Sequence, residues 1–325
     1  MRVFVTGGTG LVGNNVIRAL LEGGHEVRAL ARASSDPRPF EDLDVERFEG
    51  DIRDRDGVRR GVAGCDAVVH AAGYVKIGRT AGDMHRAVNV EGTRHIVEAC
   101  CDSGVRLVHV STINALGVAR RDEPADETTA DPAIRSCPYV ETKRAAERII
   151  LEHSPDRLHA TILNLGFVIG PWDWKPSSGE MILQVAGRWT PFAPWGGVSV
   201  CDAREVARAA VAAIDYEPPG QRFVLGGHNV TYADLWRAIA QVTGGRAPFM
   251  RAGPLMRIIA GRYGDFVSWW TGTEGEVNSV AVAMSDQWHY FRSDRAVEHL
   301  AYRIPPLDET LSVAWEWFER HGYCN

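Results

Sequence analysis

Tyr139 and Lys143 lie four residues apart in the segment Tyr-Val-Glu-Thr-Lys, which follows Pro138. If this segment is helical, the spacing places both side chains on one face, one turn apart. A phenol with a pKa of about 10 is a poor acid or base at neutral pH unless a nearby cation lowers that pKa. The chain has only three lysines, so a chance pairing with one of its 8 tyrosines is rare. The pair therefore predicts a general acid/base.

A hydroxyl group that could orient a reacting oxygen follows the apolar run at 107–110, in the sequence Ser111-Thr112-Ile113-Asn114. In open α/β sheets, ligands bind at the carboxyl ends of the strands, where this hydroxyl would lie. We favour Thr112 over Ser111 for this role because of the Ala-Leu-Gly sequence that follows at 115–117.

A glycine-rich segment, Thr-Gly-Gly-Thr-Gly-Leu-Val-Gly, lies between an apolar run at 3–5 and residues with helical apolar spacing. Glycines at this place permit a tight turn and a close approach of the backbone to a pyrophosphate, and the following helix N-terminus attracts phosphate. The segment predicts a dinucleotide site. The expected contacts are Thr6, Gly7, Gly10, Leu11, Val12 and Gly13.

The end of the second predicted strand bears on the choice between NADP and NAD. An NAD site usually has an acidic residue there, which binds the ribose 2′-hydroxyl. This strand instead ends in Ala31-Arg32, followed by Ala33-Ser34-Ser35. A guanidinium beside hydroxyls suits a 2′-phosphate, so we predict NADP. The alternative is a solvated Arg32 and a cofactor held by other contacts, which leaves NAD possible.

Further cofactor contacts are expected after the third and fourth strands. Asp51 and Ile52 follow the third strand, where a carboxylate could accept a hydrogen bond from the adenine amino group. Ala71, Ala72 and Gly73 follow the fourth strand with the small side chains that an adjacent cofactor requires. Taken singly these signals are weak, since an aspartate after a strand is more often a helix N-cap.

The elements that must position these residues alternate between strands and helices. Short apolar runs predict strands at 3–5, 27–31, 45–48, 67–70, 107–110 and 160–165, and helical spacing predicts helices near 54–62, 84–103 and 138–153. This pattern predicts the α/β class, with a Rossmann-type doubly wound parallel sheet and a smaller C-terminal substrate-binding region. We expect an NADP-binding domain at 1–170, with 200–228 returning to it, and a mainly substrate-binding region at 171–325.

The C-terminal half differs in composition, because all ten tryptophans lie at or beyond Trp172. The stretch 170–200, rich in proline and glycine, is expected to form loops without regular elements. Trp172, Trp174 and Lys175 are candidate substrate contacts. The alternatives are that the tryptophans fill a small core and that Lys175 lies in a surface loop.

Composition excludes several other classes of protein. The net charge of −6 provides no basic surface for nucleic acid. No apolar run approaches 18 residues, so no membrane span is expected, and the N-terminus lacks the apolar core of a signal peptide. The six cysteines show no metal-binding spacing, so we expect no metal and reduced thiols in a cytoplasmic protein.

Together these motifs resemble the extended short-chain dehydrogenase/reductase superfamily, also called the NAD(P)-dependent epimerase/dehydratase superfamily. The stretches 28–36 and 164–171 look most like its dihydroflavonol-reductase-like branch and its hopanoid-associated sugar epimerases. The resemblance implies a catalytic set in which Tyr139 is the acid/base, Lys143 lowers its pKa and binds the nicotinamide ribose, Thr112 orients the reacting oxygen and Asn89 supports the network. It also implies a homodimer formed through the helices at 84–103 and 138–153.

Two positions depart from the superfamily pattern. Thr112 stands where serine is commoner, which is a mild chemical change. Asn164-Leu165 replaces the usual Arg-Pro, which argues against a sugar-nucleotide substrate.

The sequence leaves three candidate functions for this protein. The first is an NADP-dependent oxidoreductase that transfers a hydride between nicotinamide and a small-molecule carbonyl or alcohol. The second is an NDP-sugar epimerase or dehydratase that keeps its NAD(P) tightly bound. The third is a non-catalytic NADP-sensing module, although such modules typically lose the tyrosine that this chain retains.

Overall fold

The computed structural model describes residues 1–129, 137–271, 275 and 277–324. Within them, seven strands form one parallel sheet in the order β10-β6-β5-β4-β1-β2-β3. The strands are β1 (Arg2–Thr6), β2 (Glu26–Ala31), β3 (Glu46–Glu49), β4 (Ala67–His70), β5 (Arg106–Thr112), β6 (Ala160–Leu165) and β10 (Gln221–Leu225). The order reverses between β1 and β4, so the predicted Rossmann-type doubly wound sheet is confirmed.

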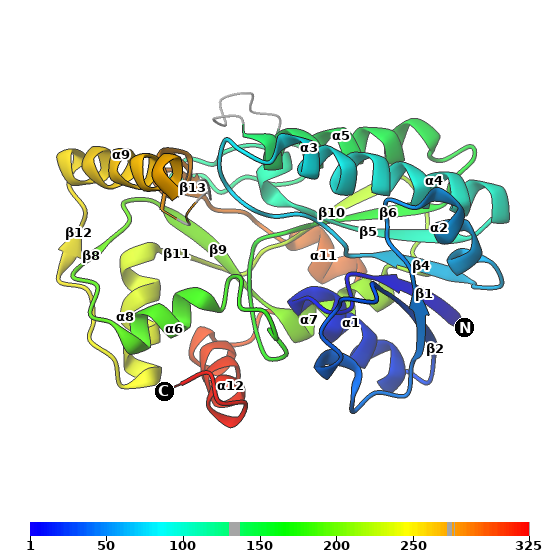
Figure 1. The fold of residues 1–325 in the computed structure, drawn as a ribbon, viewed down its shortest axis with the longest axis horizontal. Coiled ribbons are helices and arrows are strands. Elements are labelled where there is room, and N and C mark those ends of the chain that lie inside the picture. The colour runs from blue at the N-terminus through cyan, green and yellow to red at the C-terminus, as the bar shows by residue number, and fades with distance from the viewer. Residues whose placement is uncertain (130–136, 272–274, 276, 325) are drawn as a thin grey trace.

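Helices cover both faces of this sheet, as Figure 1 shows. One face carries α1 (Leu11–Glu22) and α7 (Ala203–Ala212), whose apolar side chains share one core with β1, β2 and β10. The other face carries α2 (Arg55–Val62), α4 (Gly92–Ser103) and α5 (Pro138–His153). Burial on both faces explains why the inner strands β1, β4 and β6 are nearly continuous apolar runs, whereas the edge strand β3 is polar and mostly exposed.

The helix predicted at 84–103 is three consecutive segments. A short α3 (Gly82–His85) is followed by a π-helical segment, η2 (Arg86–Glu91), and then by α4. π-helical turns are uncommon and often occur at functional sites. Short 3-10 turns also occur at η1 (Arg38–Phe40) and η3 (Ile113–Ala115).

A second sheet begins directly after β6. Its strands are β7 (Phe167–Ile169), β9 (Gly197–Asp202), β11 (His228–Thr231) and β13 (Trp288–His289), and they pack with α6 (Glu180–Gly187), α8 (Tyr232–Thr243) and α12 (Leu307–Arg320). The expectation that 170–200 lacks regular elements is therefore wrong, since α6 lies in it and β9 begins in it. β9 is stabilised by three partner strands that come from distant parts of the chain.

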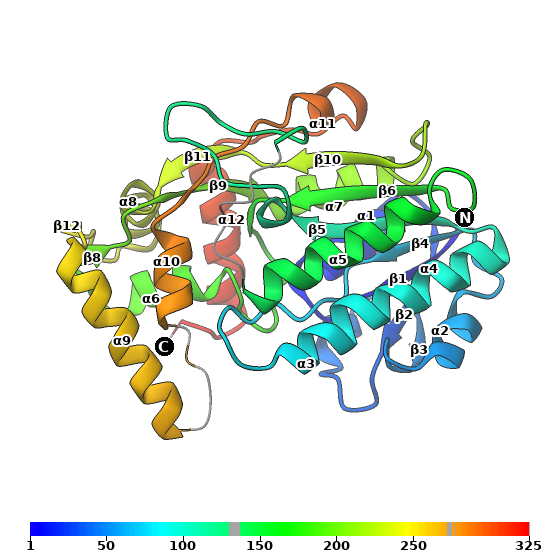
Figure 2. The ribbon, with the colours of Figure 1, turned by 90° about the horizontal axis from the view of Figure 1, so that it is seen from above.

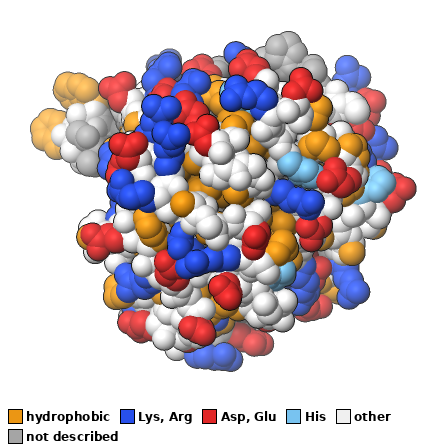
Figure 3. All heavy atoms as spheres, turned by 90° about the vertical axis from the view of Figure 1, so that its right-hand side faces the viewer, with side chains coloured by type: hydrophobic (Ala, Val, Ile, Leu, Met, Phe, Trp, Pro, Cys, Tyr) orange, Lys and Arg blue, Asp and Glu red, His pale blue; other side chains and the backbone are white. Residues whose placement is uncertain are grey.

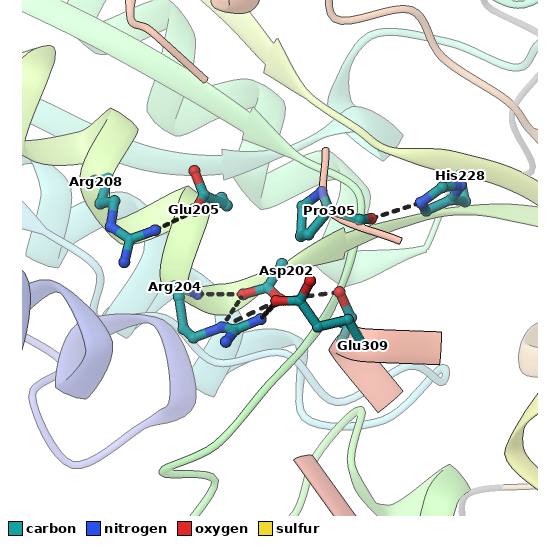
Figure 4. Close-up of polar contacts among 8 residues, drawn as sticks. Asp202, Arg204, Glu205, Arg208, His228, Pro305 and Glu309 are labelled. Carbon is teal, nitrogen blue, oxygen red and sulfur yellow. Dashed lines mark hydrogen bonds and ion pairs between the residues drawn. The ribbon is translucent and has the colours of Figure 1, made fainter. Parts of the chain in front are cut away.

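A buried carboxylate joins α7 of the first core to α12. Asp202 caps α7 by accepting from the Arg204 backbone nitrogen at 2.8 Å, and it pairs with the Arg204 guanidinium at 2.7 Å. The same guanidinium reaches Glu309 of α12 at 3.0 Å (Figure 4). The Thr310 hydroxyl of α12 also donates to Asp202, so two separate interactions join α12 to the start of α7.

The remaining elements are a two-stranded pair, β8 (Phe192–Ala193) with β12 (Met250–Arg251), and the helices α9 (Pro254–Thr271), α10 (Ser279–Ser285) and α11 (Asp294–His299). Figures 1 and 2 show α9 along the outer edge of the molecule, with one end extending past the body in Figure 2. No helix in the described ranges is both long enough and apolar enough to cross a bilayer.

Candidate active site

The glycine-rich turn between β1 and α1 is held by close backbone packing. Gly7 has a φ of +77°, and a Cβ atom there would lie 2.6 Å from the backbone of Ala71 and Ala72. A Cβ atom on Gly13 would lie 2.2 Å from the Gly7 carbonyl oxygen. The Thr6 hydroxyl adds a bond by accepting from the Ala72 amide at 3.1 Å. Thr6, Gly7 and Gly13 therefore build the turn rather than face open space.

Gly10 differs from these two glycines, because a Cβ atom there would meet the Gly7 carbonyl oxygen at an ordinary 3.5 Å. Gly10 is the N-cap of α1, and within the described residues no side chain caps this end and no acidic residue occupies the first turn. The first amides of α1, starting at Leu11 and Val12, are thus left to bind an anion. This geometry fits a dinucleotide phosphate.

Arg32 is exposed directly after β2, where its amide donates to the Ser35 hydroxyl at 3.2 Å. Asp51 follows β3, and its carboxylate already pairs with the Arg53 guanidinium at 2.7 Å. This pairing lowers the pKa of Asp51, and the nearby charge of Arg32 acts in the same direction. Arg32 and Asp51, the two predicted adenosine contacts, therefore lie close enough to interact electrostatically. Their surroundings favour the ionised form of the Asp51 carboxyl.

The other predicted cofactor residues lie around the carboxyl end of β4. Ile52 is buried, and its side chain packs against Gly92, so only its backbone could face a ligand. Gly73 is exposed, and a Cβ atom there would lie 3.8 Å from the Lys143 ammonium nitrogen. The small segment after β4 thus extends from the glycine turn to the predicted acid/base pair.

Tyr139, Lys143 and Thr112 come together at the start of α5. Side chains of Thr112 and Tyr139 are hydrogen-bonded to each other. Lys143, one turn along α5, donates to the Val110 carbonyl oxygen at 2.7 Å and is buried. Ser111 points elsewhere and donates to Glu147. The structure therefore groups three of the four predicted catalytic residues around one phenol.

Burial changes the pKa values of both members of the pair. Tyr139 is half-buried, and burial raises its pKa to about 12 against the opposing effect of the Thr112 bond, so the expected lowering of this pKa by Lys143 is not seen. Burial lowers the pKa of Lys143 to about 8, while the charge of Glu147 acts to raise it. At neutral pH the phenol therefore carries its proton and the amine is charged.

Asn89, the fourth predicted catalytic residue, is turned toward the loop after β4. Its side-chain oxygen accepts from the Tyr74 amide at 2.7 Å, and its nitrogen donates to the Tyr74 carbonyl oxygen at 2.9 Å. The same nitrogen reaches the Thr142 hydroxyl on α5 at 3.1 Å. Asn89 thus fixes the loop that follows Gly73 against the helix that carries Tyr139.

Sequence reasoning missed a buried polar cluster behind Lys143. Glu147 is 1% exposed and accepts from Ser111 and, at 2.6 Å, from Asn164. It also pairs with Arg222 of β10 at 3.0 Å. Asn164 donates in addition to the Thr112 carbonyl oxygen at 3.0 Å, so it links Glu147 to the strand end that carries Thr112. The only sequence signal was the position of Glu147, one further turn along the face of Tyr139 and Lys143.

Two further neighbours of Tyr139 also went unnoticed. His85 is buried with its ring centroid 6.3 Å from that of Tyr139. From the C-terminal half, Val280 and Met284 of α10 pack in the same apolar cluster as Tyr139. α10 therefore forms part of the wall around the phenol.

The three candidate substrate residues lie in other surroundings. Trp172 lies under the Arg18 guanidinium of α1, 3.2 Å from its ring centroid, and Trp174 packs edge-on against Trp317 of α12 at 5.1 Å. Lys175 is exposed. Among the described residues, the aromatic ring contacts of both tryptophans are with each other, with Trp317 and with His321, not with Tyr139. The alternative reading, tryptophans as core filling, agrees better with these contacts.

Comparison with known proteins identifies the family. The model of the NAD dependent epimerase/dehydratase family matches residues 3–226. The chain is 32% identical to a protein of Synechocystis named "Putative dihydroflavonol 4-reductase", over 98% of this chain and 95% of that protein. It is 34% identical to sterol demethylase protein B of Methylococcus capsulatus, over 80% of each chain.

Solved structures agree with this result. A nucleoside-diphosphate-sugar epimerase of Pseudomonas aeruginosa superposes with a TM-score of 0.81 at 25% identity, over 100% of this chain and 99% of that one. The glycine turn, the Tyr139–Lys143 pair and these similarities have one explanation. This chain belongs to the NAD dependent epimerase/dehydratase family and is an NAD(P)-dependent oxidoreductase of the extended short-chain dehydrogenase/reductase type.

Proposed function

We propose that this protein is an NADP-dependent oxidoreductase that transfers a hydride between nicotinamide and a lipophilic carbonyl or alcohol. The observation that carries the proposal is the Tyr139 phenol, hydrogen-bonded to Thr112 one helical turn from the buried ammonium of Lys143. The strand end at Arg32, without a carboxylate, supports NADP over NAD. A relative whose name refers to sterols supports a lipophilic substrate.

In the direction of reduction, each side chain has one task. The glycine turn and the first amides of α1 would hold NADPH, which when bound would provide the hydride. Tyr139 gives its hydroxyl proton to the substrate oxygen, and Thr112 donates a hydrogen bond that orients the same oxygen. Lys143 holds a positive charge beside the phenol and stabilises the phenolate that remains. Asn89 keeps the loop after Gly73 in place through its two bonds to Tyr74.

The test is steady-state reduction of a panel of ketones and aldehydes, sterol-like ones included, with NADPH or NADH. We expect turnover with NADPH, and Tyr139→Phe should lower kcat by about 10²–10⁴ because the acid is removed while the ring remains. Tyr216→Phe serves as a matched control, since that ring packs against Phe223. Full activity of Tyr139→Phe would contradict the proposal.

A second candidate function, epimerisation or dehydration of an NDP-sugar, is supported by the likeness to the Pseudomonas aeruginosa epimerase. Such an enzyme recycles its cofactor during each turnover. The two functions differ in one measurement, the nucleotide released from freshly purified, denatured protein. Stoichiometric NAD without net turnover would favour the epimerase, whereas rapidly exchanging NADP would favour the oxidoreductase.

We also propose that two copies pair through α4 and α5, as the resemblance to the superfamily implies, and that the protein works in the cytoplasm. The free thiols of five cysteines within the described ranges, Cys65, Cys100, Cys101, Cys201 and Cys324, support a reducing compartment. Sedimentation equilibrium of the purified protein tests the dimer, and a monomer at micromolar concentration would contradict it.

A further inference from the structure

α9 has the reverse of the usual amphipathic arrangement. A surface helix normally turns its apolar stripe inward and its polar residues toward water. In α9 the large apolar side chains face outward, and seven of them are between 57% and 76% exposed: Leu255, Ile258, Ile259, Tyr263, Phe266, Trp269 and Trp270. Figure 3 shows hydrophobic side chains projecting beyond the outline of the molecule.

The inward face of α9 is small and tightly fitted, so the helix is not free to rotate. A Cβ atom on Gly264 would lie 1.8 Å from the Val277 carbonyl oxygen, and one on Gly261 would lie 3.0 Å from Ser279. Asp265 accepts from the Ser279 amide at 2.9 Å, which ties α9 to the start of α10. The outward direction of the aromatic side chains is thus fixed by the packing.

The exposed charge that the described residues give this face comes from arginine. Asp265 of α9 accepts from the Ser279 amide, and Asp286, which directly follows α10, pairs with Arg257 at 2.7 Å. The exposed charged residue of α9 is Arg262. Exposed arginines also lie at 188 and 246, next to the exposed rings of Trp189 and Phe249 near the β8–β12 pair. The described part of this surface therefore combines apolar and aromatic groups with positive charge.

We propose that the outward face of α9 binds the surface of a lipid membrane that contains anionic headgroups. Tryptophan and tyrosine rings prefer the boundary between headgroups and acyl chains, and arginine is attracted to anionic lipid. α9 would lie in the plane of this boundary, since the chain has no helix that could cross it within the described ranges. The packing of α9 on α10, and of α10 on Tyr139, brings the candidate active site close to the membrane.

The first experiment is co-sedimentation of the full chain with large vesicles of phosphatidylcholine, with and without phosphatidylglycerol. It needs neither substrate nor cofactor, so it can fail while the proposed function stands. We expect binding that is strongest with the anionic lipid. The double variant Trp269→Ser/Trp270→Ser should lower the partition coefficient at least about tenfold. Ile304→Ser, a change at another exposed apolar residue, should leave it unchanged.

Two further variants separate the apolar and electrostatic contributions. Arg262→Gln should weaken binding to anionic vesicles about fivefold and leave binding to neutral ones unaltered. Trp269→Phe/Trp270→Phe should still bind, and it should lose most of the fluorescence quenching that brominated lipid causes in the wild type.

Absence of binding to either kind of vesicle would overturn the proposal. It would also be overturned if Trp269→Ser/Trp270→Ser converted a dimer to a monomer without lipid, because the face would then bind a second copy of the chain. Since both tryptophans are 76% exposed, we expect these variants to keep the wild-type melting temperature.

Discussion

The glycine turn at β1–α1 and the tryptophan cluster at 172–174 were both expected to contact ligands, and they differ in how the chain builds them. In the turn, backbone packs on backbone, and the amides of α1 are left for an anion. In the cluster, Trp172 and Trp174 use their rings to join α1 to α12. The comparison teaches that in this chain the turn keeps backbone groups available for a ligand, whereas the rings of the two tryptophans are used in packing.

The largest effects should come from two alanine substitutions in the turn. Gly13→Ala places a Cβ atom 2.2 Å from the Gly7 carbonyl oxygen, so we expect a loss of about 3 kcal/mol in the free energy of unfolding. Gly10→Ala meets nothing closer than 3.5 Å and should keep the stability. It should nevertheless lower NADPH affinity about tenfold, because the methyl group occupies the phosphate space. Chemical denaturation and calorimetric titration measure the two effects. Equal loss of stability in both variants would remove the distinction between them.

In the tryptophan cluster, the corresponding test compares the stability of alanine variants at two adjacent residues, Trp174 and Lys175. Trp174→Ala should cost about 2 kcal/mol of stability, since the ring is partly buried against Trp317. Lys175→Ala, at an exposed side chain, should change stability by less than about 0.5 kcal/mol. Neither should change KM for the substrate. A rise in KM for Trp174→Ala at unchanged stability would restore the tryptophan as a substrate contact.

A smaller effect is expected at the other end of the cofactor site. Arg32→Ser removes the guanidinium proposed to bind the 2′-phosphate, and a hydrogen bond to a charged group contributes about 1.5–3 kcal/mol. We expect KM for NADPH to rise about tenfold while KM for NADH stays constant. Arg47→Ser, a substitution in the neighbouring strand β3, is the control. An equal change in KM for NADPH and for NADH would mean that Arg32 does not bind the 2′-phosphate.

The smallest effect concerns pH. Because burial lowers the pKa of Lys143 to about 8, its charge is present below pH 8 and is lost above it. The value of kcat/KM for NADPH should therefore fall about threefold between pH 7.5 and 8.5. Lys143→Arg, whose guanidinium stays charged, should give a flat profile whatever its absolute rate. A wild-type profile that stays level to pH 10 would contradict this assignment.

Much of the fold could be predicted because most strands of the sheet are buried and alternate with helices along the chain. The helix expected at 138–153 is α5 with those same limits, since Pro138 starts it and the apolar spacing is regular. The strand at 160–165 is likewise β6. Local spacing alone was enough to bring Tyr139 and Lys143 onto one helical face.

The rest could not be predicted because it depends on contacts between distant segments. The role of Glu147 could not be predicted because its partners come from three separate strands. β5, β6 and β10 contribute Ser111, Asn164 and Arg222, which contact Glu147 in the fold. The contact of Met284 with the cluster around Tyr139 joins residues far apart in sequence. For α9, the expectation of an inward apolar face would have been wrong, because the partners of that helix accept only glycine-sized groups.

The position of β10 has a consequence for how this protein can be divided. β10 lies beside β6 in parallel register, although about fifty residues and the start of the second sheet separate them along the chain. A fragment cut after residue 170 would leave the whole backbone edge of β6 without a partner, and such an edge recruits strands from other molecules. The nucleotide-binding half cannot be expressed by simple truncation; grafting or domain exchange would have to retain the loop-back segment through Leu225.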